Sequence, residues 1–135
     1  MRRQITQERG GVTMPRVVHF EMGADKPGRA VRFYRRVFGW KIEKWAGPVD
    51  YWLYTTGPDE QGGINGALMP RPDKSFATVN TIDVPALDEF VAKVVAAGGK
   101  TVGEKETVPG VGTFIYCQDT EGNTFGMMQS EMPVK

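Results

Sequence analysis

Apolar and polar residues alternate along residues 17–22, VVHFEM. Val18, Phe20 and Met22 share one side of this segment, whereas His19 and Glu21 share the other. A period of two with one apolar side predicts a half-buried β-strand. The turn GADKPGR follows, and Pro27 stands where the first turn of a helix tolerates proline.

The segment after this turn has the spacing of an amphipathic helix that ends at Gly39. Three strand-like pieces come next, WKIEKW, DYWLYTT and GINGALM, separated by glycine and proline. The apolar positions of the helix fall at i, i+3, i+4, i+7 and i+8, and we expect them to form its buried face: Ala30, Phe33, Tyr34, Val37 and Phe38.

The same order of elements returns in the second half of the chain. FATVNTIDV predicts a strand, and KTVGEKETV, GTFIYCQD and NTFGMMQ predict three more after an intervening helix. Landmarks recur at a nearly constant interval, since Asp25 precedes Asp83 by 58 residues and Gly66 precedes Gly126 by 60. Such an ordered series indicates a duplicated βαβββ unit. The apolar face of the second helix is expected at Leu87, Phe90, Val91, Val94 and Val95.

The predicted fold class is therefore α+β, with two tandem βαβββ units at residues 16–70 and 75–130. Together they form a single domain, 16–130, after a polar tail at residues 1–15 that lacks the apolar centre of a secretory signal. Each helix can cover only one face of its strands. If the sheets are curved, their other faces wrap a cleft, and clefts are where small molecules bind.

Charge and composition narrow the range of partners. The net charge of +1 gives no global field that would attract nucleic acid or an anionic membrane. No apolar run approaches the roughly 20 residues of a membrane span. The single cysteine, Cys117, fits a reducing compartment and is expected to be a small buried residue. We therefore expect a cytoplasmic protein with a small-molecule ligand. Four arginines on the outward face of the first helix are interpreted as a solvated face, with an anion or nucleic-acid patch as the alternative: Arg29, Arg32, Arg35 and Arg36.

Three stretches, VVHFEMGADKPGRAVRFYRRVFGWKI, GGINGALMPRP and DTEGNTFGMMQ, resemble the vicinal oxygen chelate superfamily. This superfamily includes glyoxalase I, bleomycin-resistance proteins and extradiol dioxygenases. These sequence stretches are most similar to those of bacterial proteins described as related to lactoylglutathione lyase. The resemblance implies a glyoxalase-like fold and, since family members are commonly dimers, a homodimer. It also implies a divalent metal held by His, Gln or Glu from the first and last strands of each unit.

The ligand positions of this chain depart from the family pattern. His19 matches the ligand of the first strand, but Gly66, Ala77 and Gly126 stand at the other three positions. A zinc or transition-metal site needs three or four N, S or carboxylate donors. We therefore expect no cofactor, with a divalent metal as the alternative. Moving the alignment by one residue brings in no strong ligand either: Phe76 or Thr78, Asn65, and Phe125 or Met127.

Two functions from different classes follow. The first is a binding module, similar to bleomycin-resistance proteins, that holds a small organic molecule in the cleft without a metal. The second is a lyase, isomerase or dioxygenase that uses a divalent metal or His19 and Glu21 as an acid–base pair. Of the aromatic residues Trp45, Tyr51, Trp52 and Tyr54, half should face the cleft and half the helix, with stacking on a ligand and plain core packing as the two alternatives for them. The expected ligand-binding residues are His19, Trp52, Tyr54, Asn65 and Met128.

Overall fold

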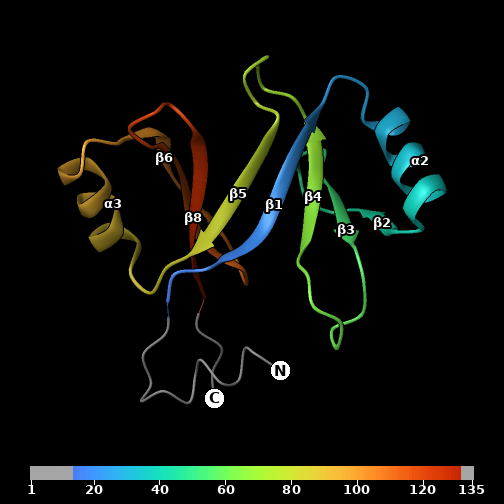
Figure 1. The fold of residues 1–135 in the computed structure, drawn as a ribbon, viewed down its shortest axis with the longest axis horizontal. Coiled ribbons are helices and arrows are strands. Elements are labelled where there is room, and N and C mark those ends of the chain that lie inside the picture. The colour runs from blue at the N-terminus through green and yellow to red at the C-terminus, as the bar shows by residue number, and fades with distance from the viewer. Residues whose placement is uncertain (1–13, 132–135) are drawn as a thin grey trace.

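Two βαβββ units meet edge to edge in the computed structural model, which describes residues 14–131 (Figure 1). The first unit consists of β1 (Val17–Ala24), α2 (Pro27–Phe38), β2 (Lys41–Lys44), β3 (Trp52–Thr55) and β4 (Asn65–Pro70). The second consists of β5 (Thr78–Asp83), α3 (Leu87–Ala96), β6 (Lys100–Val108), β7 (Gly112–Gln118) and β8 (Thr124–Ser130). The predicted α+β class and the order of elements are confirmed. Of the predicted polar tail, residues 1–13 lie outside the described residues.

All eight strands belong to one sheet with the order β2-β3-β4-β1-β5-β8-β7-β6. Each unit's first strand runs parallel to its own last strand, and the two first strands, β1 and β5, pair antiparallel at the centre. The order therefore reads the same from both edges once equivalent strands are exchanged. The register of the central pair sets Glu21 opposite Val79 and His19 opposite Thr81. Within residues 14–131 the two units thus pair inside a single chain.

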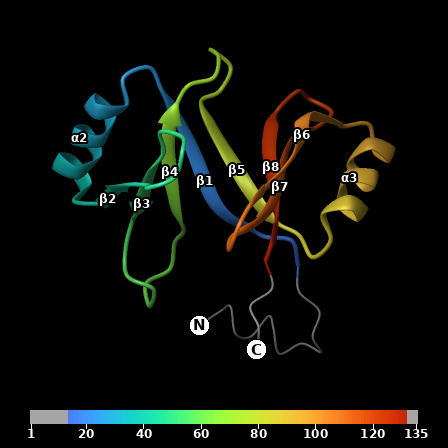
Figure 2. The same cartoon turned by 180° about the vertical axis from the view of Figure 1, so that it is seen from behind.

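The sheet is bent, and the helices lie at its two outer flanks, as Figure 1 and Figure 2 show from opposite sides. Each helix covers a separate core. Phe20 and Met22 of β1 pack against the first core, as their alternation predicted, whereas Val18 on the same side is 45% exposed. No helix within residues 14–131 is long and apolar enough to span a membrane. The first core is Ala24, Val31, Ile42, Tyr54 and Leu68, and the second is Val84, Leu87, Ile115, Cys117 and Met127.

The buried face of α2 differs from the predicted one. Phe33, Val37 and Phe38 are 53%, 52% and 57% exposed, whereas Val31 is buried. The reason is that Phe20, Trp40 and Tyr54 already fill the space between α2 and the sheet with aromatic rings. Phe33 and Phe38 then pack against the ring of Tyr34 at the border of the core instead of entering it. In α3, Val95 is likewise exposed and not buried as predicted.

The face of the sheet opposite the helices, called the inner face below, also holds buried side chains. Ala67 and Val79 are almost completely buried, yet they belong to neither of the two cores. They lie on β4 and β5, on either side of Glu21 in β1. The inner face is therefore the region where residues of the two units come together. The side chains on the inner face include those of His19, Glu21, Ala67, Val79, Thr81 and Tyr116.

The hydroxyl group of Tyr54 is buried in the first core and has no hydrogen-bond partner within residues 14–131. Burial raises the pKa of this phenol to about 12. Because an unsatisfied buried hydroxyl costs free energy, we expect Tyr54→Phe to leave the free energy of unfolding unchanged or to raise it by about 1 kcal/mol. Tyr54→Ala, which also removes the ring, should lower it by about 3–5 kcal/mol. Chemical denaturation of both variants measures the difference, and a loss above about 1 kcal/mol in Tyr54→Phe would show that the hydroxyl has a partner.

Candidate functional site

Glu21 is the one charged side chain that is buried within residues 14–131, at 8% exposure. It comes from the centre of β1 and points to the inner face. Its Oε2 accepts a hydrogen bond of 2.6 Å from the hydroxyl of Tyr51, and its Oε1 accepts one from the hydroxyl of Tyr116. Tyr51 directly precedes β3 in the first unit, and Tyr116 lies on β7 in the second. One carboxylate therefore joins side chains of both units.

His19 extends this cluster by one further group. Its Nε2 lies 3.2 Å from the hydroxyl oxygen of Tyr51. Because Tyr51 has one hydroxyl proton and gives it to Glu21, the tyrosine oxygen accepts at this contact and Nε2–H donates. A neutral His19 then carries its free lone pair on Nδ1. The four residues His19, Glu21, Tyr51 and Tyr116 are called the His19–Glu21 network below.

The charge of this network rests on the carboxylate of Glu21. Burial lowers the pKa of His19 below its ordinary value of 6.5, and the opposing effect of Glu21 is smaller. Burial, with the added effect of Glu21, raises the pKa of both Tyr51 and Tyr116. At neutral pH the histidine and both phenols are therefore neutral. The ion pairs found within residues 14–131 do not include Glu21, so its buried charge is met by hydrogen bonds.

The local sequence explains how the two tyrosines reach the carboxylate. On β7, Ile115 and Cys117 point into the second core, so the residue between them, Tyr116, points to the inner face. The predicted burial of Cys117 is confirmed. Tyr51 is fixed by its carbonyl, which accepts a 2.7 Å bond from Trp45 N–H, and by the edge of the Trp45 ring. The sequence interpretation missed Tyr116 as a site residue, although alternation along GTFIYCQ was a signal for it.

Trp52 and Tyr54 do not lie where the sequence analysis expected them. Both pack in the first core under α2, on the opposite face of the sheet from His19. They pair with Leu68 and Gly66 of β4, which also face that core. Of the four aromatic residues, Trp52 and Tyr54 therefore face the helix, whereas Tyr51 contacts Glu21 on the inner face. The choice of Trp52 and Tyr54 as the cleft pair was wrong.

The other two predicted ligand-binding residues are not joined to the network by a hydrogen bond. Asn65 is exposed at the start of β4, beside His19 in the sheet, and its Oδ1 accepts a 2.8 Å bond from Thr56 N–H. Met128 is half-buried on β8, opposite Phe114. Of the predicted site residues, the structure therefore brings together His19 and Glu21. It adds Tyr51 and Tyr116, which the prediction did not include.

The inner-face positions next to the network do not supply a metal-ligand set. A side chain at Gly66 would meet the ring of Phe20, so this position faces the first core and not the inner face. Ala67 is the inner-face neighbour of Glu21 on β4, and Val79 is its neighbour on β5. Gly126 does face inward, toward Thr81 and Tyr116. Residues 14–131 hold no group of three or more His, Cys, Asp or Glu side chains that could bind a metal ion, so the donors present do not fit the superfamily's metal centre.

A family model described as the Glyoxalase/Bleomycin resistance protein/Dioxygenase superfamily matches residues 16–127. The chain belongs to this superfamily. Its two βαβββ units and their central β1–β5 pairing are thus the superfamily's scaffold, on which several different activities occur. Membership by itself does not select one of them.

Curated relatives include a protein named "Putative glyoxylase CFP32" from Mycobacterium bovis and from Mycobacterium tuberculosis. Each is 31% identical over 112 residues, which are 81% of this chain and 42% of the relative. The chain therefore spans less than half the length of the curated relatives that it matches.

Solved structures with the same fold are more distant in sequence. A hypothetical protein, BH1468, from Bacillus halodurans has a TM-score of 0.70 at 10% identity, over 91% of this chain and 99% of that one. Methylmalonyl-CoA epimerase from Mycobacterium tuberculosis has a TM-score of 0.64 at 13% identity, over 85% and 87%. A methylmalonyl-CoA epimerase solved in complex with methylmalonyl-CoA and NH4+ has a TM-score of 0.66 at 14% identity, over 90% of this chain and 100% of that one. At these identities the likeness concerns the fold alone.

The ionisation of His19 provides a direct test of the network. It is the single histidine of the chain, so its imidazole NMR signals need no assignment by mutagenesis. We expect a titration midpoint below 6.5, because burial disfavours the imidazolium form. In Glu21→Gln the midpoint should fall further, since the nearby negative charge is removed. A midpoint at or above 6.5 in the wild-type protein would contradict this description of the site.

The same shift predicts how stability depends on pH. Between the folded-state pKa of His19 and 6.5, the unfolded chain binds more protons at this residue than the folded chain does. The contribution of His19 to the free energy of unfolding is therefore complete above pH 6.5 and decreases as the pH falls through that window. His19→Gln, which cannot titrate, should lose less stability over the same interval.

Proposed function

We propose that the protein binds a small organic molecule on the inner face, over the His19–Glu21 network, without the superfamily's metal. The observation that carries this proposal is a buried carboxylate that accepts hydrogen bonds from tyrosines of both units beside a neutral histidine. Small-molecule sites typically combine apolar surroundings with a few convergent polar groups. Ala67 and Val79, which are almost completely buried, and the ring of Phe114, which lies against Tyr116, make the surroundings of the four polar groups apolar.

The energetics of Glu21 support a functional role over a purely structural one. A buried charge without an ionic partner contributes less to stability than an apolar side chain of similar size would. Val79, the neighbour of Glu21 on β5, shows that an apolar residue fits at the same depth. Perturbed ionisable groups that cluster in this way are typical of ligand and active sites. The free Nδ1 of His19 then selects ligands that can donate an N–H or O–H hydrogen bond.

We further propose that two copies assemble into a homodimer in the cytoplasm. The exposed Val37 and Phe38 on α2 support assembly, because apolar side chains grouped on one helix favour contact with a partner surface. The sole cysteine, Cys117, is buried and unpaired, which supports a reducing compartment.

A second candidate function is metal-free proton transfer, as a lyase or isomerase. The observation that favours it is the orientation of His19, whose Nε2 contacts the hydroxyl of Tyr51 beside Glu21, while Nδ1 has no hydrogen-bond partner within residues 14–131. As a base, Nδ1 would accept a substrate proton, and the carboxylate would stabilise the imidazolium through the hydroxyl of Tyr51. Turnover assays on glutathione hemithioacetals, catechols and methylmalonyl-CoA distinguish this function from binding alone.

A fragment library screened by NMR tests the binding proposal. We expect hits that shift the imidazole signals of His19. His19→Gln should weaken their binding about three- to tenfold, the effect of one lost hydrogen bond. Asn80→Ala is the matched control, because Asn80 is exposed and pairs with Phe20 of β1, whose side chain faces the first core. If His19→Gln binds the hits as tightly as wild type and instead loses several kcal/mol of stability, His19 is structural and the proposal fails.

Elemental analysis of protein purified without chelators tests the absence of a metal. Ala67, Val79 and Gly126 lie on the inner face next to the network, and their side chains have no N, O or S atom to bind a metal. We therefore expect no stoichiometric Zn, Ni, Fe or Mn. One equivalent of tightly held metal that disappears in His19→Ala would contradict this expectation and return the protein to the superfamily's metal chemistry.

A further inference from the structure

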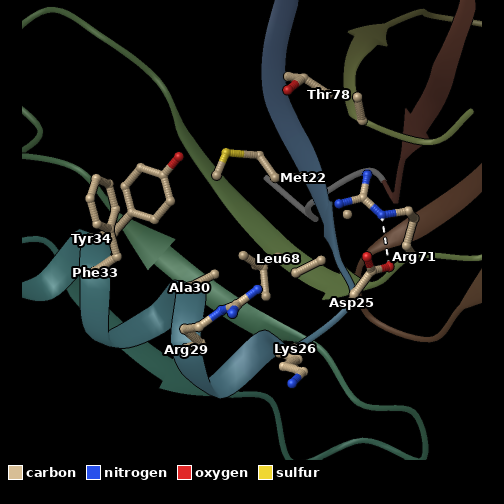
Figure 3. A pocket seen from close by; sticks show the side chains of 13 residues that line it. Met22, Asp25, Lys26, Arg29, Ala30, Phe33, Tyr34, Leu68, Arg71 and Thr78 are labelled. Atoms are coloured by element: carbon tan, nitrogen blue, oxygen red, sulfur yellow. Dashed lines mark hydrogen bonds and ion pairs between the residues drawn. The ribbon is translucent and has the colours of Figure 1, made fainter. Parts of the chain in front are cut away.

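A cavity of about 540 Å³ lies on the helix side of the sheet, between α2 and the ends of β1 and β4 (Figure 3). Its wall includes Met22 from β1, Leu68 from β4, and Ala30, Phe33 and Tyr34 from α2. Met22 and His19 point to opposite faces of the same strand. The cavity is therefore separate from the His19–Glu21 network, and its role does not depend on the proposed function of that network.

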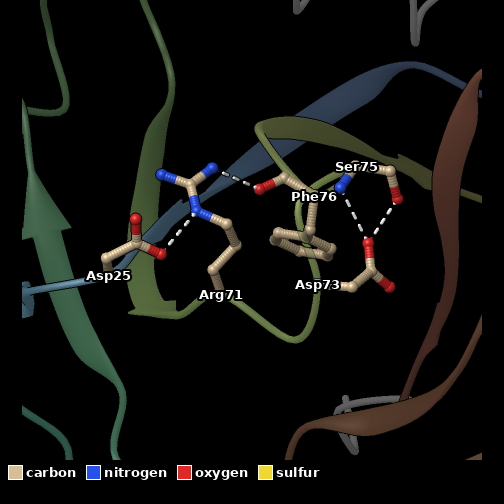
Figure 4. Close-up of polar contacts among 5 residues, drawn as sticks. All are labelled: Asp25, Arg71, Asp73, Ser75 and Phe76. Carbon is tan, nitrogen blue, oxygen red and sulfur yellow. Dashed lines mark hydrogen bonds and ion pairs between the residues drawn. The ribbon is translucent and has the colours of Figure 1, made fainter.

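Three cationic side chains and one carboxylate surround the apolar wall: Lys26, Arg29, Arg71 and Asp25. Arg71 is held in place, since its Nε lies 3.1 Å from Asp25 Oδ1 and one of its terminal nitrogens donates a 2.9 Å bond to the carbonyl of Phe76 (Figure 4). Asp25 and Arg71 neutralise each other. The ion pairs found within residues 14–131 include neither Lys26 nor Arg29, so the cavity keeps an excess of positive charge.

The N-terminal end of α2 is a second, independent feature that favours an anion in this cavity. The N-terminal end of a helix carries partial positive charge and normally attracts acidic residues. The equivalent helix of the second unit, α3, follows this rule with Asp88 and Glu89 in its first turn. In α2 the first turn has no acidic residue, and its cap position is Lys26 without a side-chain capping bond. Two cations thus stand where the helix itself favours negative charge, and they line the cavity.

We propose that this cavity binds an organic anion, with an acyl or aryl body against Met22, Ala30 and Leu68 and a carboxylate or phosphate head between Lys26 and Arg29. The volume suits such a ligand, because small-molecule sites typically measure about 300–1,000 Å³. The guanidinium of Arg29 matches either head group with two parallel N–H donors. Arg71, already paired with Asp25, supports the wall and does not carry the head group.

Isothermal titration calorimetry with decanoate, decyl phosphate and decyltrimethylammonium, each below the concentration at which it forms micelles, tests this proposal. Both anions should bind saturably, and the cation should bind at least tenfold more weakly. Arg29→Gln should weaken both anions about five- to tenfold, and Lys26→Gln combined with it should weaken them further. Arg36→Gln is the matched control, because it removes the same charge from the same helix outside the cavity, and it should leave both affinities unchanged.

Methyl NMR of labelled methionines locates the bound anion. Decanoate should shift the Met22 methyl signal and leave that of Met128 on β8 in place. His19→Gln should not change decanoate affinity, so a failure at the inner face and a failure at this cavity are distinguished. The proposal is overturned by any one of four results: no saturable binding of either anion, equal binding of the cation, equal weakening by Arg36→Gln, or a shift at Met128 in place of Met22.

Discussion

The antiparallel pairing of β1 with β5 is the contact on which the rest of the structure depends. Each unit alone would leave its first strand at an open edge, and the central pairing closes both edges at once. It also decides which residues share the inner face, since Glu21 lies opposite Val79 and His19 opposite Thr81. A slip of one residue would turn His19 and Glu21 toward α2 and bring Phe20 and Met22 to the inner face. The cost of exposing those apolar side chains holds the register.

The inner face of this sheet does not carry the metal ligands that the resemblance to the superfamily implied. The neighbours of Glu21 on the adjacent strands are Ala67 and Val79, which offer no donor atoms. The carboxylate instead receives hydroxyl protons from Tyr51 and Tyr116. Two phenols satisfy both oxygens without changing the net charge, so a single negative charge persists at the junction of the units. That charge is an electrostatic feature which any molecule bound at the inner face must accommodate.

The order of elements, the face of β1 and the fold class could be predicted from local patterns, because period and turn residues are properties of short segments. The site could be predicted only in part. Where both sides of a strand carry large apolar residues, as in DYWLYTT, alternation tells which residues share a face but not which face meets the helix. The repeat was also misleading at one point, since Gly66 faces the first core and Gly126 faces inward. The two glycines match in sequence but differ by one residue in strand register, which no pattern within either unit reveals.

The distance along the chain between Glu21 and Tyr116 has a consequence for how the protein acquires its site. The two residues are 95 positions apart. Contacts between such remote segments require closure of a long loop, and their entropic cost is recovered only when much of the intervening chain is already ordered. The second donor of the carboxylate can therefore join only once β7 of the second unit is in place. The first unit supplies His19, Glu21 and Tyr51 but not Tyr116, so a polypeptide still emerging from the ribosome lacks the complete network until β7 has been made.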